Sequence, residues 1–232
     1  MSVARAAAKT SAQPSHRAGA KGQIRHANRE LIVGAANRVF ARAGFNGATT
    51  AAIAQAAGLP KANVHYYFGS KEELYREVLA RTLHEWLVPL DSLAPDADPR
   101  SALEAYIRAK MAMSAAHPDA SRVFANELLH GAPVLGELIR SELRGVVRKR
   151  AAVIDGWIAA GKMAPVDATH LFFTIWAATQ TYADFDVQVR AVLGRTKLTA
   201  RDHARATEHV VSLVLRGCGL GCGGSSEVSF GA

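Results

Sequence analysis

Residues 49–73, TTAAIAQAAGLPKANVHYYFGSKEE, contain two short helical segments joined by a turn. Thr49 or Thr50 is suited to begin the first segment, because a threonine hydroxyl accepts a hydrogen bond from an N–H group of a first helical turn. Gly58 followed by Leu59 and Pro60 favours a reversal of the chain directly after the first segment. The spacing predicts a helix, a turn and a second helix.

The second of these helices is predicted from residue 61 to about residue 67. Val64 and Phe68 stand four residues apart, so both can anchor the helix on a core. The side chains left at its exposed start are short or polar, and such groups can meet base edges in a major groove: Lys61, Ala62, Asn63 and His65. The side chains suited to phosphate contacts are Tyr66, Tyr67 and Lys71, with Thr49 and Thr50 before them. A helical corner around a buried aromatic cluster, with no DNA partner, is the alternative.

The distribution of charge along the chain favours the DNA-binding interpretation over a helical corner without a DNA partner. Up to residue 71 the chain has ten Lys and Arg residues and one acidic residue, Glu30, whereas the remainder has eighteen basic and nineteen acidic residues. A basic module on a nearly neutral body is typical of a protein that binds a polyanion. The sequence therefore predicts a double-stranded DNA operator as the partner of residues 49–73.

The whole chain of 232 residues, 49% of them hydrophobic, is expected to be all-α. A first helix should bury Leu31, Ala35 and Val39 and stop at Gly44, and Ser70 with Glu73 should cap a long helix toward residue 86. Further helices are predicted at 99–116, 119–130, 133–160, 167–185 and 199–216. The domains are predicted as a flexible basic arm (1–26), a helix-turn-helix domain (27–72), a helical ligand-binding and dimerisation domain (73–216) and a disordered Gly-rich tail (217–232).

Other function classes lack their signatures in this sequence. No Gly-rich phosphate loop, nucleophile elbow or His pair of a metalloprotease is present, so neither an enzyme nor a cofactor is expected. Cys218 and Cys222 have no nearby ligands, so no metal is expected. No apolar stretch approaches the ~18 residues of a membrane span, and residues 1–30 lack the apolar core of a secretory signal. A cytoplasmic location without membrane contact is the expectation.

The quoted stretch and its surroundings resemble the TetR family of transcriptional regulators. The matching segments are FNGATT (45–50), IA (53–54), AGL (57–59) and YYFGSKEELY (66–75). The resemblance implies that Lys61, Ala62, Asn63 and His65 read bases and that Thr50, Tyr67 and Lys71 contact phosphates. It also implies a repressor that is a homodimer, held by its last two long helices, with an effector pocket in each C-terminal domain.

The C-terminal half contains an apolar stripe that fits such a dimer. Residues at alternating three- and four-residue spacing form it, and the last helix adds a second stripe: Leu171, Ile175, Ala178, Tyr182 and Phe185, then Val210, Val211 and Val214. Leu171, Ile175, Ala178, Tyr182, Val210 and Val214 are therefore predicted at the dimer interface. An ordinary core face is the alternative for each of them.

A narrower resemblance concerns the effector. Residues 175–185, IWAATQTYADF, together with segments spread over 28–216, resemble the pyrimidine-utilisation (Rut-type) regulators, which respond to uracil. Trp176, Gln180 and Asp184 share one helix face, where an indole can stack on a planar ring and Gln180 can both donate and accept. Trp86 and Phe124 are further pocket candidates. The alternatives are that these residues serve the core or the dimer, and that the repressor controls an efflux or catabolic operon through an unrelated hydrophobic ligand.

Overall fold

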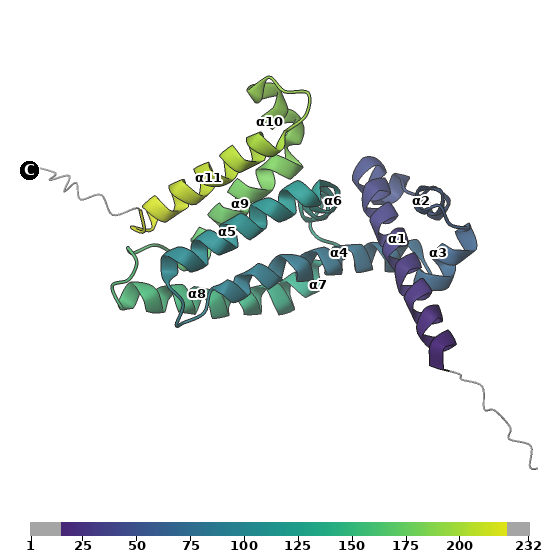
Figure 1. Ribbon diagram of the computed structural model, residues 1–232, viewed down its shortest axis with the longest axis horizontal. Coiled ribbons are helices and arrows are strands. Elements are labelled where there is room, and N and C mark those ends of the chain that lie inside the picture. The colour runs from purple at the N-terminus through teal and green to yellow at the C-terminus, as the bar shows by residue number, and fades with distance from the viewer. Residues whose placement is uncertain (1–14, 222–232) are drawn as a thin grey trace, which may run out of the picture.

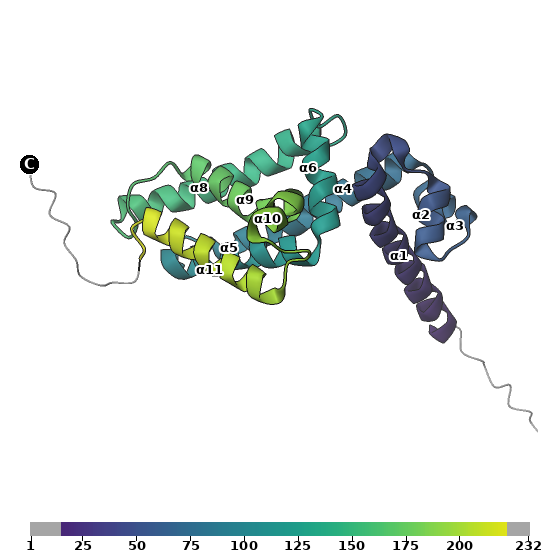
Figure 2. The same cartoon turned by 90° about the horizontal axis from the view of Figure 1, so that it is seen from above.

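The computed structural model describes residues 15–221, with side chains from Gly22 onward. In this part of the chain every regular element is helical, which confirms the all-α expectation. Figure 1 shows two parts: a small module formed by α1 to α3 at one end, and a larger body formed by α5 to α11. Helix α4 begins in the module and runs into the body, and the view from above agrees (Figure 2).

The module begins with α1 (Ser15–Gly47), which starts inside the segment expected to be a flexible arm. Residues 1–14 of that arm lie outside the described residues. Gly44 interrupts the helix with φ 65° and ψ 177°, a backbone conformation that glycine adopts without steric cost. The kink lets the chain turn toward α2, as the sequence predicts for this glycine.

Helices α2 (Thr50–Ala57) and α3 (Lys61–Phe68) form the predicted helix-turn-helix. Thr49 Oγ1 accepts a hydrogen bond from Ala52 N at 3.1 Å, so Thr49 is the N-cap and Thr50 the first helical residue. Gly58 ends α2 in the left-handed conformation (φ 67°). Helix α4 (Lys71–Leu87) begins after Ser70, whose Oγ accepts from Glu73 N at 3.1 Å.

The body is a bundle of longer helices. A 3-10 turn (Val88–Ser92) follows α4 and leads to α5 (Pro99–Ala116), which runs back toward the module, and α6 (Pro118–Leu129) then packs against α1. The helix expected at 133–160 is divided into α7 (Gly136–Leu138), a π-helical turn (Ile139–Leu143) and α8 (Arg144–Ala159). Helices α9 (Ala168–Asp184), α10 (Asp186–Leu193) and α11 (Ala200–Gly217) complete the bundle. Helix α10 is an element that the sequence analysis did not predict.

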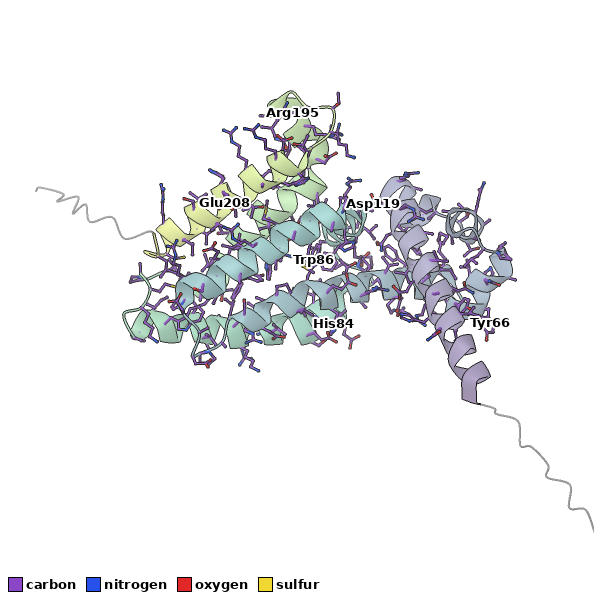
Figure 3. The ribbon with its side chains drawn as sticks, viewed as in Figure 1. Tyr66, His84, Trp86, Asp119, Arg195 and Glu208 are labelled. Atoms are coloured by element: carbon purple, nitrogen blue, oxygen red, sulfur yellow. The ribbon has the colours of Figure 1, made fainter. Side chains whose placement is uncertain are left out.

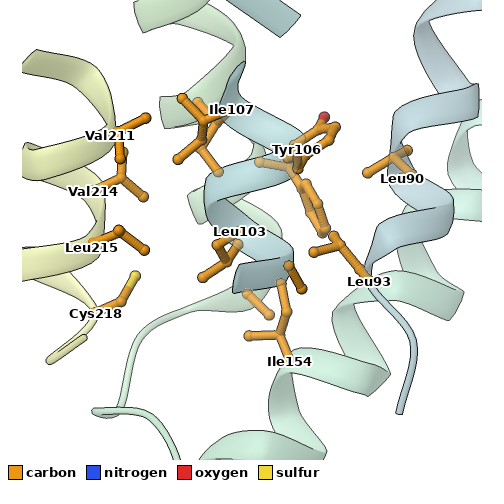
Figure 4. Close-up of a cluster of buried hydrophobic side chains, with 14 of the residues drawn as sticks. Leu90, Leu93, Leu103, Tyr106, Ile107, Ile154, Val211, Val214, Leu215 and Cys218 are labelled. Atoms are coloured by element: carbon orange, nitrogen blue, oxygen red, sulfur yellow. The ribbon is translucent and has the colours of Figure 1, made fainter. Parts of the chain in front are cut away.

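Two hydrophobic clusters hold these parts together. The body cluster lies between α5, α8, α9 and α11, and Figure 4 shows Leu103, Tyr106 and Ile107 of α5 packed between its neighbours. Cys218 is 1% exposed in this cluster, and its carbonyl oxygen accepts from Ala164 N at 2.9 Å. The chain just after α11 is therefore packed on the body rather than frayed, while Cys222 and the residues after it lie outside the described residues.

The second cluster joins the module to the body. It contains Phe40, Ile53 and Phe68 of the module, but also Phe124 of α6 and Leu135 of the loop after α6. The module therefore has no core of its own that is separate from the body. This shared packing fixes the position of the helix-turn-helix relative to the body.

Candidate DNA-binding surface and effector cavity

The start of α3 presents the predicted base-reading residues. Lys61, Ala62 and His65 are exposed and Asn63 is half-buried, whereas Val64 and Phe68 on the opposite side are buried. His65 Nδ1 lies 3.1 Å from the carbonyl oxygen of Gly69, so a proton on Nδ1 would leave Nε2 free to face a base. This face of α3 is short, polar and accessible, as entry into a major groove requires.

The predicted phosphate contacts lie around this face, with one difference. Tyr66 is 72% exposed at the end of the module farthest from the body (Figure 3), and the Tyr67 hydroxyl accepts from Asn28 Nδ2 at 3.3 Å. Thr49 is exposed and Thr50 half-buried at the N-terminus of α2, where N–H groups favour an anion. Tyr66, Thr49 and the start of α3 are thus all accessible on the module.

Lys71 differs from the expectation of a free phosphate contact. Its Nζ donates to the carbonyl oxygens of Phe45 at 2.8 Å and Ala48 at 3.1 Å, and lies 4.3 Å from the centre of the Phe45 ring. The ammonium group therefore holds the turn between α1 and α2 in shape. Sequence spacing alone does not reveal this contact, because the partners are backbone carbonyls more than twenty residues away.

A cavity of about 240 Å³ lies in the body between α4, α5, α6 and α9. Four of the five residues predicted for the effector line it: Trp86, Phe124, Trp176 and Gln180. Trp86 is half-buried, and Figure 3 shows it on the body side of the molecule, far from Tyr66 of the module. Because pockets for drug-sized ligands usually exceed about 300 Å³, this volume suits a small ligand.

Hydrogen bonds and ring contacts fix the walls of the cavity. Trp176 Nε1 donates to Tyr106 Oη at 2.7 Å, and the Trp86 and Phe124 ring centres are 4.8 Å apart. Asp184, the fifth predicted residue, is absent from the cavity lining and accepts instead from Ser121 Oγ at 2.5 Å. Burial raises the pKa of Asp184 above its usual value, against the opposing effects of Ser121, Arg122 and Lys110.

Lys110 is a cavity residue that the sequence analysis did not select. Its side chain is 2% exposed, and its Nζ lies 4.0 Å from the centre of the Trp86 ring. Burial lowers the pKa of Lys110 to about 7, although the charge of Asp184 acts in the opposite direction. The signal was present in the sequence, because Lys110 follows Tyr106 by four residues on the apolar face of α5.

The predicted dimer residues divide into two groups. Leu171, Ala178 and Tyr182 are half-buried, but Ile175 (0% exposed), Val210 (4%) and Val214 (7%) lie inside the body cluster of a single chain. Those three are needed for the fold and are not available to a second copy. The reason is that α9 is apolar on more than one side, so spacing could not distinguish its inner from its outer face.

Other apolar side chains of α9, α10 and α11 are exposed on the outside of the body. Phe173 of α9 and Leu213 of α11 are 49% and 61% exposed, and Val192 and Leu193 of α10 are 80% and 51% exposed. An open groove of about 700 Å³, larger than the cavity beside Trp86, runs between α9, α10 and α11. Its walls are exposed on one side, so it is a surface groove and not an enclosed ligand site.

Membrane-spanning helices and metal clusters are both absent from the described part of the chain. No helix in residues 15–221 is long and apolar enough to cross a membrane. Within the same residues, no three His, Cys, Asp or Glu side chains gather as a metal site would need.

Sequence comparisons identify the family. Residues 32–78 match the model for "Bacterial regulatory proteins, tetR family", and residues 79–221 match the model for "YcdC-like protein, C-terminal region". The HTH-type transcriptional regulator RutR of Escherichia coli K12 is 40% identical over 199 residues, which are 86% of this chain and 94% of that protein. The HTH-type transcriptional repressor NicS of Pseudomonas putida is 32% identical over 120 residues, 50% of this chain and 55% of NicS.

Solved structures agree on the fold. A tetR-family regulatory protein from Rhodococcus RHA1 superposes with a TM-score of 0.66 at 22% identity, covering 85% of this chain and 98% of that one. The TetR-family regulator PfmR from Thermus thermophilus superposes with a TM-score of 0.61 at 20% identity, covering 83% and 99%. With two family models spanning residues 32–221, the chain belongs to the TetR family of transcriptional regulators, with a C-terminal region of the YcdC-like type.

Proposed function

We propose that this regulator is a homodimeric repressor that binds its operator through α2 and α3 and is released from it by uracil or a close pyrimidine. The observation that carries the ligand proposal is the cavity between α4, α5, α6 and α9, which combines aromatic walls with the polar side chains of Gln180 and Lys110. The 40% identity to RutR over most of both chains supports the same class of regulator. Such a protein acts on chromosomal DNA, so a cytoplasmic location is part of the proposal.

The chemistry of the cavity favours a planar ring with an imide edge. Trp86, Phe124 and Trp176 offer flat apolar surfaces for the faces of the ring. The Gln180 amide can donate to a carbonyl oxygen and accept from a ring N–H, and the Lys110 ammonium can donate to a second carbonyl oxygen. A purely hydrophobic effector would leave the buried Lys110 ammonium without an acceptor, which is costly.

The outer face of α9 and α11, continued by α10, is proposed as the dimer interface. Phe173, Leu213 and Val192 supply apolar area there, and the open groove between the three helices can receive side chains from a second copy. Two copies are needed because two α3 helices must reach successive major grooves, about 34 Å apart.

The DNA contacts should separate by type. We expect Asn63→Ala or His65→Ala to relax the preference at particular base pairs by about 1–3 kcal/mol, because each removes a group that meets base edges. Tyr67→Phe should instead weaken binding to operator and random duplexes alike, because it removes a phosphate contact. Titrations of both duplexes by fluorescence anisotropy measure the two affinities. An unchanged operator-to-random ratio for Asn63→Ala would refute the base-reading role.

The dimer interface should respond to charge on its outer face only. Leu213→Asp is expected to leave a folded monomer with much weaker operator binding, because two facing carboxylates would be desolvated in the interface. Ile175→Asp is the matched comparison and should unfold the body, since this side chain is 0% exposed within one chain. Circular dichroism and light scattering distinguish the two results. A stable dimer of Leu213→Asp would place the interface elsewhere.

Gln180 should be needed for the response to uracil. Gln180→Leu keeps the bulk of the side chain but removes its donor and acceptor, so the buried edge of the pyrimidine would lose about 1–3 kcal/mol or more of binding energy. The variant should remain dimeric and bound to the operator in the presence of uracil, as an electrophoretic shift assay can show. If calorimetry detects no uracil binding to the unmutated protein at millimolar concentrations, this effector is rejected while the family assignment stands.

Lys110 should make uracil affinity dependent on pH. The charged groups facing it are Asp184 of α9 and, beyond that, Arg122 of α6, while Tyr106 shares its helix. Because the pKa of Lys110 is about 7, its ammonium can donate to a ligand carbonyl below pH 7 and is lost above it. Uracil affinity should therefore be highest below pH 7 and fall by up to about tenfold per pH unit above it. Calorimetry from pH 6 to 8 tests this, and Lys110→Met should bind weakly with no slope.

A further inference from the structure

A buried carboxylate connects the body to the module. Glu127 of α6 is 4% exposed and receives three hydrogen bonds. Its Oε2 accepts from the hydroxyl of Tyr75 on α4 at 3.2 Å. Its Oε1 accepts from the backbone N–H groups of Val134 at 2.6 Å and Leu135 at 3.1 Å. Both oxygens are thus satisfied, which is the condition for keeping a carboxylate in an apolar interior.

On the module side, Tyr75 of α4 packs against two aromatic side chains of α1. Its ring centre is 4.9 Å from that of Phe40 and 4.8 Å from that of Phe45. The carbonyl oxygen of Phe45 accepts from Lys71 Nζ, which also donates to the carbonyl oxygen of Ala48. The next residue after Ala48 is the N-cap of α2, so the ring of Tyr75 supports the point where the helix-turn-helix begins.

On the body side, Glu127 shares a helix with a wall of the cavity. Phe124 precedes it by three residues and therefore lies on the same side of α6. The loop that Glu127 holds contains Ala132 with φ 55°, a left-handed conformation that costs energy for a residue other than glycine. The two hydrogen bonds from Val134 and Leu135 help to keep that loop in place, and Leu135 is itself 1% exposed in the cluster shared with the module.

We infer that the Glu127–Tyr75 hydrogen bond transmits occupancy of the effector cavity to the helix-turn-helix, which makes Glu127 a positioning residue for the response. This inference rests on the proposed function, because it assumes an effector in the cavity beside Phe124. A ligand that displaces Phe124 moves α6, and Glu127 then moves Tyr75 against Phe40 and Phe45. Close-packed side chains transmit such a displacement because the interior has few voids into which it could dissipate.

The hydroxyl of Tyr75 is suited to this task at ordinary pH. Burial, and then the charge and hydrogen bond of Glu127, raise the pKa of Tyr75 far above its usual value. The group therefore keeps its proton and remains a donor. The connection responds to movement of α6 and not to titration of the tyrosine.

If the Glu127–Tyr75 hydrogen bond (the bridge) were purely structural, removing it would change only the stability of the protein. The test therefore measures the coupling between uracil binding and operator binding. The quantity is the ratio of operator dissociation constants with and without saturating uracil, on an operator selected from random duplexes with the unmutated protein. In the unmutated protein this ratio should fall within the ~5–150-fold range of allosteric couplings. In Tyr75→Phe and Glu127→Gln it should fall toward one, while calorimetry shows uracil affinity within about twofold of the unmutated protein.

Thr82→Val is the matched control. Thr82 is also buried on α4, and its Oγ1 donates to the carbonyl oxygen of Val78 at 2.8 Å, away from the bridge. The variant therefore removes one buried hydroxyl from the same helix and should keep the full ratio. If Glu127→Gln fails to fold, Tyr75→Phe decides alone, because it keeps the ring and its contacts with Phe40 and Phe45.

A second measurement requires no effector. Coupling between sites is reciprocal, so operator binding should slow hydrogen–deuterium exchange in α6 and in residues 130–135 of the unmutated protein. Tyr75→Phe should abolish this change and Thr82→Val should keep it. If uracil does not bind, the proposed effector is rejected. The exchange measurement then still tests whether the Glu127–Tyr75 hydrogen bond couples α6 to the helix-turn-helix. A coupling ratio or an exchange response that survives in Tyr75→Phe overturns the inference, as does the absence of any operator-induced change in the unmutated protein.

Discussion

Helices of eight residues are too short to be stable in water by themselves, and the DNA-binding surface is built on two of them, α2 and α3. Their stability comes from burying Ile53 and Ala54 of α2, and Val64 and Phe68 of α3, in a cluster with α1 and α4. That cluster does not end with the module, since it also contains Phe124 and Leu135. The helices of the proposed DNA-binding surface are therefore held in part by α6, which also lines the cavity proposed for the effector.

Among the residues that the structure describes, the buried side chains that can carry a charge are Lys110 and Glu127. Lys110 faces the cavity with its charge over an indole ring, and Glu127 sits where body and module meet. The Glu127 carboxylate is compensated by three donors, whereas Lys110 is 2% exposed and its burial lowers the pKa of the ammonium group. A ligand with carbonyl oxygens supplies the acceptors that Lys110 lacks. Burying a charge costs free energy at both positions. Hydrogen bonds from the protein offset that cost at Glu127, whereas at Lys110 a bound ligand could offset it.

Local signals in the sequence were sufficient for most of the fold but not for all of the site. Thr49, Ser70, Asp167 and Thr199 cap the helices that they were expected to begin, because capping depends on residues within one turn. The inner and outer faces of α9 could not be separated in this way, and Ile175 was assigned to the dimer although it is fully buried in one chain. The contact of Lys71 with Phe45 and Ala48, and the bridge from Glu127 to Tyr75, join residues distant in sequence. Such contacts follow from packing and have no signature in spacing.

Two helices, α4 and α6, connect the cavity to the module. Each carries one residue at the cavity and one at the contact with the module. Helix α4 carries Trp86 at the cavity and Tyr75 at the module, while α6 carries Phe124 and Glu127. The Trp86 and Phe124 rings are in contact, with centres 4.8 Å apart, so a ligand that enters between α4 and α9 meets both helices at once. An effector shifts an equilibrium only by its difference in affinity between two states. Because Tyr75 and Glu127 are hydrogen-bonded, α4 and α6 cannot move independently without breaking a buried hydrogen bond, so the proposed effector would act on states in which both helices move together.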